Sequence, residues 1–151
     1  MKLVLGSDHA AYEMKKEIKK YLEEKGHEVI DVGTNSPERC DYPNIAYQGA
    51  VKVFSKEVDL GILICGTGLG MSLAANKVKG IRAVVVSESY SARLSRMHND
   101  ANILCFGARV IGIETAKDIV DNFLAAKFLG EQHLKRVEMI KEIEEGKFTV
   151  K

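Results

Sequence analysis

Short, mostly apolar runs alternate with longer amphipathic segments along the whole chain. Runs of four to six residues that are rich in β-branched and other apolar side chains, with glycine or charged residues at their ends, are typical of buried strands. The pattern predicts five such strands, at residues 2–6, 28–32, 60–64, 81–86 and 103–106.

The segments between these strands carry apolar residues at helical spacing. Met14, Ile18 and Leu22 predict a first helix, and Asp41-Tyr42-Pro43 is typical of the start of a second, because proline is tolerated in a first turn. Further helices are expected just after residue 70, over 89–97, around 116–124 and over about 132–145.

Strands that alternate with helices predict a parallel sheet that is covered on both faces. We find no internal repeat, low-complexity tract or linker in the sequence. We therefore expect one α/β domain over residues 1–151. Its predicted architecture is a doubly wound, five-stranded parallel sheet in an α/β/α sandwich, of the flavodoxin-like, Rossmann-type class.

In folds of this class, ligands bind beyond the carboxyl ends of the strands, at the point where strand order reverses. For a strand order of 2-1-3-4-5, the reversal lies between the first and third strands. Asp8 and His9 follow the first strand, and residues 65–70 follow the third, so we expect them to face each other across one crevice. The helix ending in His98-Asn99-Asp100 comes after the fourth strand, and Arg109 comes after the fifth.

The junction after the third strand carries the most informative chemistry. Cys65 ends the apolar run, and glycines follow at 66, 68 and 70. A glycine-rich turn at a helix start exposes N–H groups that bind anions, and such a site stabilises a thiolate. This indicates chemistry on a phosphorylated or oxyanion-forming small molecule. The alternatives are a tight turn without a ligand and a cysteine that is only a small buried hydrophobe, which is our interpretation of Cys105.

A dinucleotide-binding turn is a further alternative for residues 66–70. Glu88 lies roughly twenty residues further on, where an acidic ribose ligand is expected. The third glycine, however, comes one residue too early, and the turn follows the third strand rather than the first. The sequence therefore favours an anion site over a dinucleotide site.

Two other clusters each have a structural and a functional interpretation. Asp8 is placed to cap the next helix by accepting the N–H groups of the two alanines after His9, which is compatible with ligand binding. His98 is either a solvated residue near a helix C-terminus, favoured there by the dipole, or an acid–base partner for Cys65. His133 has no comparable setting.

The composition argues against several classes of function. With 22 basic and 21 acidic residues, the net charge of +1 gives no long-range field for nucleic acid or a membrane surface. The longest uncharged run, residues 60–75, is too short and too rich in glycine to span a bilayer. Three widely spaced cysteines without a signal peptide predict a cytoplasmic protein with free thiols. No His or carboxylate spacing indicates a metal site.

At these residues the chain resembles the type B ribose-5-phosphate isomerases, within the wider family that also holds allose- and galactose-6-phosphate isomerases. The resemblance covers nearly the whole chain. Several independent motifs carry it in order, at residues 6–10, 41–43, 64–70, 75–77, 80–83, 95–102 and 106–109.

The resemblance implies a metal-free, cofactor-free isomerase that interconverts ribose 5-phosphate and ribulose 5-phosphate in the pentose phosphate pathway. By matching position, it implies that Cys65 takes the proton from C2, that Thr67 assists it, and that His98 opens the sugar ring. It implies that the enediolate binds the amides of Gly66, Gly68, Leu69 and Gly70, and that the phosphate binds Arg109 and Arg136. It implies that Asp8 and His9 bind sugar hydroxyls. Tyr42 and Asn99 would make further contacts with the substrate.

The resemblance also implies a homodimer, or a higher homo-oligomer, whose active sites use both subunits. The final helix, over about 132–145, would then reach the partner and bring Arg136 to the phosphate; docking on its own sheet is the alternative. Gln132 stands where some relatives carry an additional arginine. The alternative functions are isomerisation of a hexose 6-phosphate (allose or galactose) and a flavin- or nucleotide-binding module without chemistry.

Overall fold

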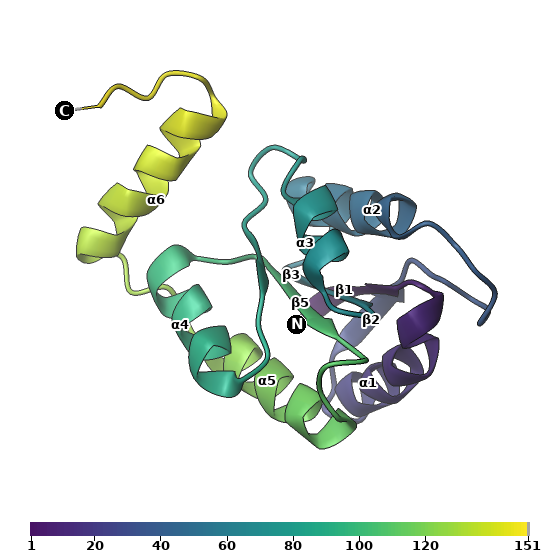
Figure 1. The fold of residues 1–151 in the computed structure, drawn as a ribbon. Helices are drawn as coiled ribbons and strands as arrows, with labels where there is room; N and C mark the ends of the chain where they lie inside the picture. The colour runs from purple at the N-terminus through teal and green to yellow at the C-terminus, as the bar shows by residue number, and fades with distance from the viewer. Residues whose placement is uncertain (151) are drawn as a thin grey trace.

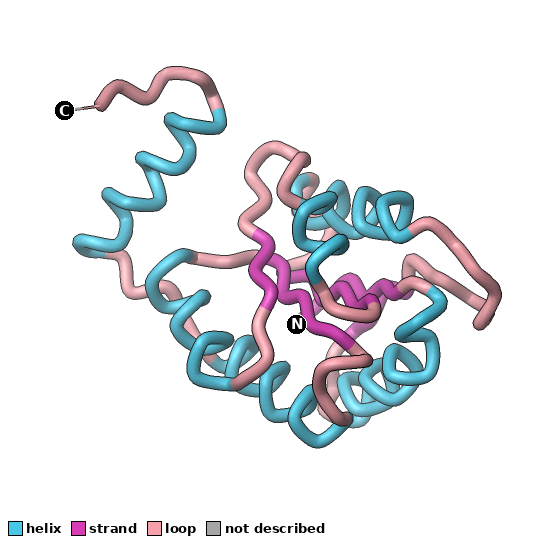
Figure 2. Tube along the Cα trace, in the orientation of Figure 1, coloured by secondary structure: helices cyan, strands magenta, loops and turns pink. Residues whose placement is uncertain are grey.

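The computed structural model describes residues 1–150 and contains the predicted alternation of strands and helices (Figure 1, Figure 2). The strands are β1 (Lys2–Ser7), β2 (Glu28–Asp31), β3 (Leu60–Cys65), β4 (Ala83–Val85) and β5 (Ile103–Gly107). The helices are α1 (Tyr12–Glu24), α2 (Tyr42–Phe54), α3 (Leu69–Ala75), α4 (Ser89–Asn99), α5 (Ile113–Ala125) and α6 (Glu131–Glu144), with a short 3₁₀ turn, η1 (His9–Ala11), before α1.

The five strands of the sheet are all parallel and pair in the order β2-β1-β3-β5-β4. The order 2-1-3-4-5, which we used to locate the crevice, is therefore wrong in one place, because β5 lies between β3 and β4. Every residue of β5 is buried, which suits a central strand, whereas β4 is short and only partly buried, which suits an edge. The reversal between β1 and β3 lies where it was expected.

Helices cover both faces of the sheet, so the chain forms two apolar cores (Figure 1). On one face, α1, α4 and α5 pack against alternate residues of β1, β3 and β5. On the other face, α2 and α3 pack against the other set, which includes Cys65 and Cys105. Cys105 is completely buried, as predicted for a core residue. The expected α/β/α sandwich is confirmed, and the Cys65 side chain belongs to its α2–α3 side.

The last helix, α6, lies outside this sandwich. Figure 1 shows it standing clear of the sheet, and its main packing contact is with α4. Its bounds agree with the predicted helix to within one residue. Docking on the sheet of its own chain is therefore not the role of this helix. No helix within residues 1–150 combines the length and apolar character that a membrane crossing requires.

Candidate active site

Strand β3 delivers the Cys65 thiol to the carboxyl edge of the sheet. Only 5% of the residue is exposed, and its Sγ accepts the backbone N–H of Gly68 at 3.1 Å. This bond folds the turn back over the sulfur, and α3 begins directly afterwards at Leu69. The predicted strand–turn–helix arrangement is therefore present, with a thiol and backbone donors gathered at one point.

Two glycines allow this turn to pack closely against β5. Gly68 has a φ of +81°, and a Cβ there would lie 2.9 Å from the backbone of Phe106. A Cβ on Gly107 would lie 2.5 Å from the Cα of Thr67. A side chain at either position would push the turn away from the neighbouring strand. The glycines thus fix the place of the turn relative to the sheet, and Thr67 is held at its exposed tip.

Arg109 and Tyr42 lie against the same turn. The Arg109 side chain passes over Gly66: a Cβ on Gly66 would lie 3.4 Å from the Cδ and Nη1 atoms of Arg109. The backbone N–H of Arg109 donates to the Gly66 carbonyl at 3.0 Å. The Tyr42 ring, at the start of α2, lies so close to Gly70 that a Cβ there would come within 2.6 Å of it. A guanidinium and a phenol therefore border the Cys65 turn.

The end of β1 completes this edge of the sheet. The backbone N–H of Asp8 donates to the Ile64 carbonyl at 3.2 Å, which ties the end of β1 to the end of β3. The Asp8 carboxylate, 7% exposed as a residue, caps η1 by accepting the N–H of Ala10 at 3.0 Å, whereas the next N–H donates to the Asp8 backbone carbonyl. His9 accepts the N–H of Cys40 on Nδ1 at 3.3 Å, so a neutral His9 carries its proton on Nε2.

These groups together form what we call the cysteine half. Its members come from the ends of β1, β3 and β5 and from the start of α2, four segments that are far apart in the sequence. It contains Asp8, His9, Tyr42, residues 65–70 and Arg109.

The remaining predicted site residues lie at the opposite edge of the sheet. α4 runs back along the sheet, so its last turn, with His98 and Asn99, lies beside the amino ends of the strands. Arg82, directly before β4, donates from Nε to the Asn99 carbonyl at 3.1 Å, and its backbone N–H donates to the side chain of Asn102, directly before β5, at 2.8 Å. The six residues of β3 separate the two edges by roughly 16 Å. Within one chain, His98 and Cys65 are therefore not partners.

α6 brings a second histidine and an arginine to the His98 edge. The rings of His98 and His133 stack, with centroids 4.2 Å apart and planes inclined by 6°. Arg136 is exposed one helical turn beyond His133, and Gln132 is exposed beside it. Sequence reasoning missed His133. The available signal was its spacing of three from Arg136, which puts both on one face of a helix. We call His98, Asn99, His133 and Arg136 the histidine half.

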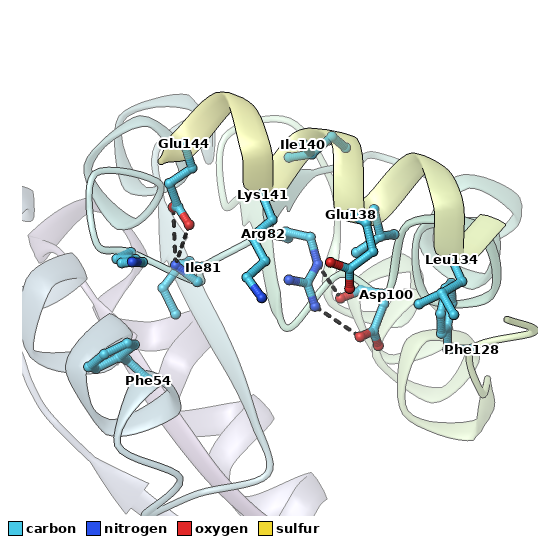
Figure 3. Close-up of a pocket in the computed structure, with 13 residues that line it drawn as sticks. Phe54, Ile81, Arg82, Asp100, Phe128, Leu134, Glu138, Ile140, Lys141 and Glu144 are labelled. Carbon is cyan, nitrogen blue, oxygen red and sulfur yellow. Dashed lines mark hydrogen bonds and ion pairs between the residues drawn. The ribbon is translucent and has the colours of Figure 1, made fainter. Parts of the chain in front are cut away.

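A cavity of about 370 Å³ lies between α6 and the body of the chain. Figure 3 shows α6 passing over it, with Phe54 and Ile81 on the side of the body and the Arg82–Asp100 ion pair at 2.9 Å within it. Near its far end, Glu144 accepts the N–H of Gly80 with both carboxylate oxygens at 3.0 Å. α6 therefore contacts the rest of the chain near both of its ends, through the His98–His133 stack and the Glu144–Gly80 hydrogen bonds, and covers the cavity between them.

Glu88, the acidic residue of the dinucleotide interpretation, caps a helix in the structure. As the N-cap of α4, it accepts the backbone N–H of Ser91 with its two carboxylate oxygens at 3.0 and 2.9 Å. Hydrogen bonding by the Ser91 side chain, and then by its backbone N–H, holds the pKa of the Glu88 carboxyl below its usual value. Glu88 thus has a structural role at the start of α4.

The His, Cys, Asp and Glu side chains, which are the usual metal ligands, are spread over the structure. Within residues 1–150, no three side chains of His, Cys, Asp or Glu gather as they would around a metal ion. The three cysteines are all free thiols, and two of them, Cys65 and Cys105, are buried.

Comparison with known proteins identifies the family. A sequence profile of the Ribose/Galactose Isomerase family matches residues 3–140. Ribose-5-phosphate isomerase B of Escherichia coli K12 is 58% identical over 144 residues, which cover 95% of this chain and 97% of that protein. The solved ribose-5-phosphate isomerase B of Clostridium thermocellum matches with a TM-score of 0.96 at 55% identity, covering 97% of this chain and 99% of that one. That of Thermotoga maritima matches with a TM-score of 0.91 at 50% identity, covering 93% and 97%. The chain therefore belongs to the Ribose/Galactose Isomerase family.

Proposed function

We propose that this protein is a cytoplasmic aldose–ketose isomerase that interconverts ribose 5-phosphate and ribulose 5-phosphate, with Cys65 as the base. The observation that carries the proposal is the Cys65 thiol, which is nearly buried at the end of β3 and held by the Gly68 N–H at 3.1 Å. The names of two close relatives, both ribose-5-phosphate isomerases B, suggest the substrate.

The reaction moves one proton between neighbouring carbons. The Cys65 thiolate takes the proton from C2 of the open-chain aldose, and the electron pair shifts through the C1–C2 bond onto the carbonyl oxygen at C1, giving an enediolate. The proton of the C2 hydroxyl then passes to the oxygen on C1, a carbonyl forms at C2, and the new thiol returns its proton to C1. Atoms and charge balance within the substrate and one thiol, so this step requires no cofactor.

The turn that follows Cys65 suits the charge that this step develops. Negative charge grows on an oxygen two atoms from the reacting carbon, and fixed N–H donors at that point are the largest expected aid. The turn from Gly66 to Gly70 provides backbone donors on a segment that the glycines hold against β5. Thr67 lies within the turn, with its Oγ1 accepting the Leu69 N–H at 3.3 Å. Arg109 lies over the turn, where it would hold an anionic group of the substrate.

In the proposed mechanism, the histidine half acts in the active site of a second subunit. A pentose phosphate bound at Cys65 does not extend to His98 of the same chain, roughly 16 Å away along the sheet. In a two-fold symmetric dimer, contacts come in reciprocal pairs, so each cysteine half would receive the histidine half of the partner. His98 would then act on the sugar ring and Arg136 on the phosphate, from the adjacent helices α4 and α6.

Exposed apolar side chains beside the cysteine half support a second copy as the partner. On α2 and α3, Tyr47, Leu69 and Leu73 are 61%, 55% and 66% exposed. Large apolar side chains gathered next to a polar site are typical of an interaction surface. We therefore propose a homodimer, or a higher homo-oligomer, that buries these residues.

The test is turnover by the purified protein after exhaustive chelation of metal ions. We expect ribulose 5-phosphate to form from ribose 5-phosphate at full rate, with allose 6-phosphate and galactose 6-phosphate turned over less efficiently as judged by kcat/KM. Faster turnover of a hexose phosphate would reassign the substrate within the same chemistry. Loss of activity on chelation, with recovery on addition of one divalent metal, would overturn the mechanism.

A further inference from the structure

The stacked pair of His98 and His133 lies at the contact between α4 and α6. His98 lies in the last turn of α4 and His133 in the first turn of α6, and their rings lie parallel within 6° at a centroid distance of 4.2 Å. Both residues are partly buried. This is the only stacked ring pair recorded among residues 1–150, and one of its members is the proposed ring-opening residue.

The backbone on both sides of the stack is anchored. The N–H of Leu129, just before α6, donates to the Met97 carbonyl at 3.0 Å, which fixes the start of α6 to the last turn of α4. On the other side, the Asp100 carboxylate accepts from Arg82 at 2.9 Å and from Arg96 at 2.8 Å, which fixes the end of α4 to the body of the chain. The position of one ring relative to the other is thus set by the fold.

We propose that His133 is a positioning residue for His98, holding the plane of the His98 ring in the orientation that acts on the ring oxygen of the substrate. The inference rests on the proposed isomerase function and on the role of His98 in ring opening. An imidazole at the end of a helix turns freely about its side-chain bonds, and a parallel ring against one face limits that rotation. Holding a catalytic group in its reactive orientation lowers the barrier because the entropy of ordering is already lost.

The charges around His133 suit this role. The charged and titratable groups that face it are His98 from α4 and Arg136 and Glu131 from α6 itself. Desolvation lowers the pKa of His133, the charges of His98 and Arg136 lower it further, and Glu131 opposes them. These surroundings favour the neutral form of the supporting ring.

Three variants separate positioning from other roles. His133→Ala removes the stack, His133→Phe keeps a flat ring without a titratable nitrogen, and Leu134→Ala alters the next residue of α6, which lines the cavity rather than the stack. Ribose 5-phosphate, which is mainly cyclic, is compared with erythrose 4-phosphate, which cannot close a five-membered ring. We expect His133→Ala to lower kcat for the cyclic substrate by about tenfold or more while leaving the open-chain substrate within about twofold. His133→Phe should restore most of the loss, and Leu134→Ala should change neither rate.

A structural measurement independent of activity accompanies the kinetics. In the wild type, the ring current of His133 shifts the Cε1 proton resonance of His98 upfield; His133→Ala should abolish this shift, and His133→Phe should retain one. Equal losses on both substrates, or no rescue by phenylalanine, would overturn the positioning role. If the wild type shows the upfield shift but turns over neither sugar phosphate, the isomerase function fails instead, so the two failures are distinguishable.

Discussion

The cysteine half and the histidine half are built in different ways. The cysteine half consists of strand ends and a backbone turn, and hydrogen bonds from backbone N–H groups hold it: Ala108 donates to the Cys65 carbonyl at 2.9 Å and Gly68 to the Cys65 sulfur at 3.1 Å. The histidine half consists of helix ends, and side chains hold it, through the His98–His133 stack and the ion pairs of Asp100. The proposed base thus lies at a turn that backbone N–H groups hold in place.

The difference also concerns access to a partner. Cys65 is buried within its own chain, whereas Arg136 is exposed on a helix that stands clear of the sheet (Figure 1). A buried base needs little from a second subunit. Arg136, in contrast, is exposed on a helix at the edge opposite its own cysteine half, so in the proposed dimer it would bind substrate in the partner's site. In the proposed mechanism, the cysteine half would therefore carry the carbon chemistry, and the partner's histidine half would add ring opening and a further contact to the phosphate.

Replacing Cys65 by alanine should have the largest effect on activity. We expect kcat to fall below about a hundredth of the wild-type value, which corresponds to at least about 2.7 kcal/mol in the barrier, because no other side chain of the cysteine half carries a thiol. The fold should remain intact. The measurement is the initial rate of ribulose 5-phosphate formation, and a variant that keeps more than that fraction would show that Cys65 is not the main base.

Cys105→Ala is the matched control on the same face of the sheet. Burial, and then the neighbouring Cys65, raises the pKa of the Cys105 thiol well above its usual value, so it does not supply a base. Removing its sulfur should instead lower the free energy of unfolding by about 1 kcal/mol, as for other small deletions in a packed core, and leave kcat unchanged. Chemical denaturation and the same assay together distinguish the two cysteines.

His98→Asn should have the next largest effect, and only on cyclic substrate. If His98 transfers a proton to or from the ring oxygens, the loss on ribose 5-phosphate should be on the order of a hundredfold, the lower range for general acid–base catalysis. The loss on erythrose 4-phosphate should be small. Equal losses on the two substrates would remove the ring-opening role and leave His98 as a general binding residue.

Mixing inactive variants tests whether the halves meet across a dimer. When Cys65→Ala and Arg136→Ala chains are unfolded and refolded together, random pairing makes about half of the dimers mixed, and each mixed dimer has one intact site. About a quarter of the wild-type activity should therefore return. Cys65→Ala with His98→Asn should behave in the same way.

The decisive control mixes two variants of the histidine half. His98→Asn and Arg136→Ala damage the same half, so every site of their mixed dimer keeps one defect and no activity should return. Recovery in this mixture would show that His98 and Arg136 serve different sites. No recovery in any mixture would show that each chain uses its own residues.

The Cys65 turn of the cysteine half was predictable because its parts are local in sequence. A strand, a thiol and three glycines follow one another within residues 60–70, and their order dictates the turn. The cap by Asp8 was predictable for the same reason, since an aspartate directly before a helix start binds the nearest N–H groups. The positions of β4 and β5 in the sheet were not predictable in this way. The more apolar β5 is buried on both faces in the centre, and β4 lies at the edge, which is a property of the whole sheet rather than of a local motif.

The place of His98 was missed for a geometric reason. Sequence order puts His98 after the fourth strand, which suggests the carboxyl edge, but an 11-residue helix at about 1.5 Å per residue carries its end roughly 16 Å back along the sheet. The stack on His133 depends on how two helices pack, and no local pattern specifies that packing. The start of β4 was also misplaced, because Asn102 takes the N–H of Arg82 and Ile81 lies in a turn closed on Val78.

The smallest expected effect comes from the cap of α4, the helix that begins beside the Cys65 turn and ends in the histidine half. Glu88→Ala removes the acceptor of the Ser91 N–H, so the first turn of α4 should fray and the melting temperature should fall by a few degrees. The kcat should stay unchanged, because in the proposed dimer the halves would meet across the interface and not along α4. Glu114→Ala is the control: it lies in the first turn of α5, where it pairs with Lys117 on the surface, and such pairs contribute little.

The pH dependence of the melting temperature tests whether the charge of the Glu88 carboxylate causes the stabilisation. The folded-state pKa of Glu88 lies below its ordinary value of 4.5, because Ser91 donates to the ionised form. A lowered pKa gives stability that is fully present above the unfolded-state value and is lost as pH falls through the folded-state value. The difference in melting temperature between wild type and Glu88→Ala should therefore be constant from neutral pH down to about 5 and shrink at lower pH. A difference that persists unchanged in acid would mean that the variant loses packing rather than a charged cap, and a fall in kcat would mean that α4 itself couples the two halves.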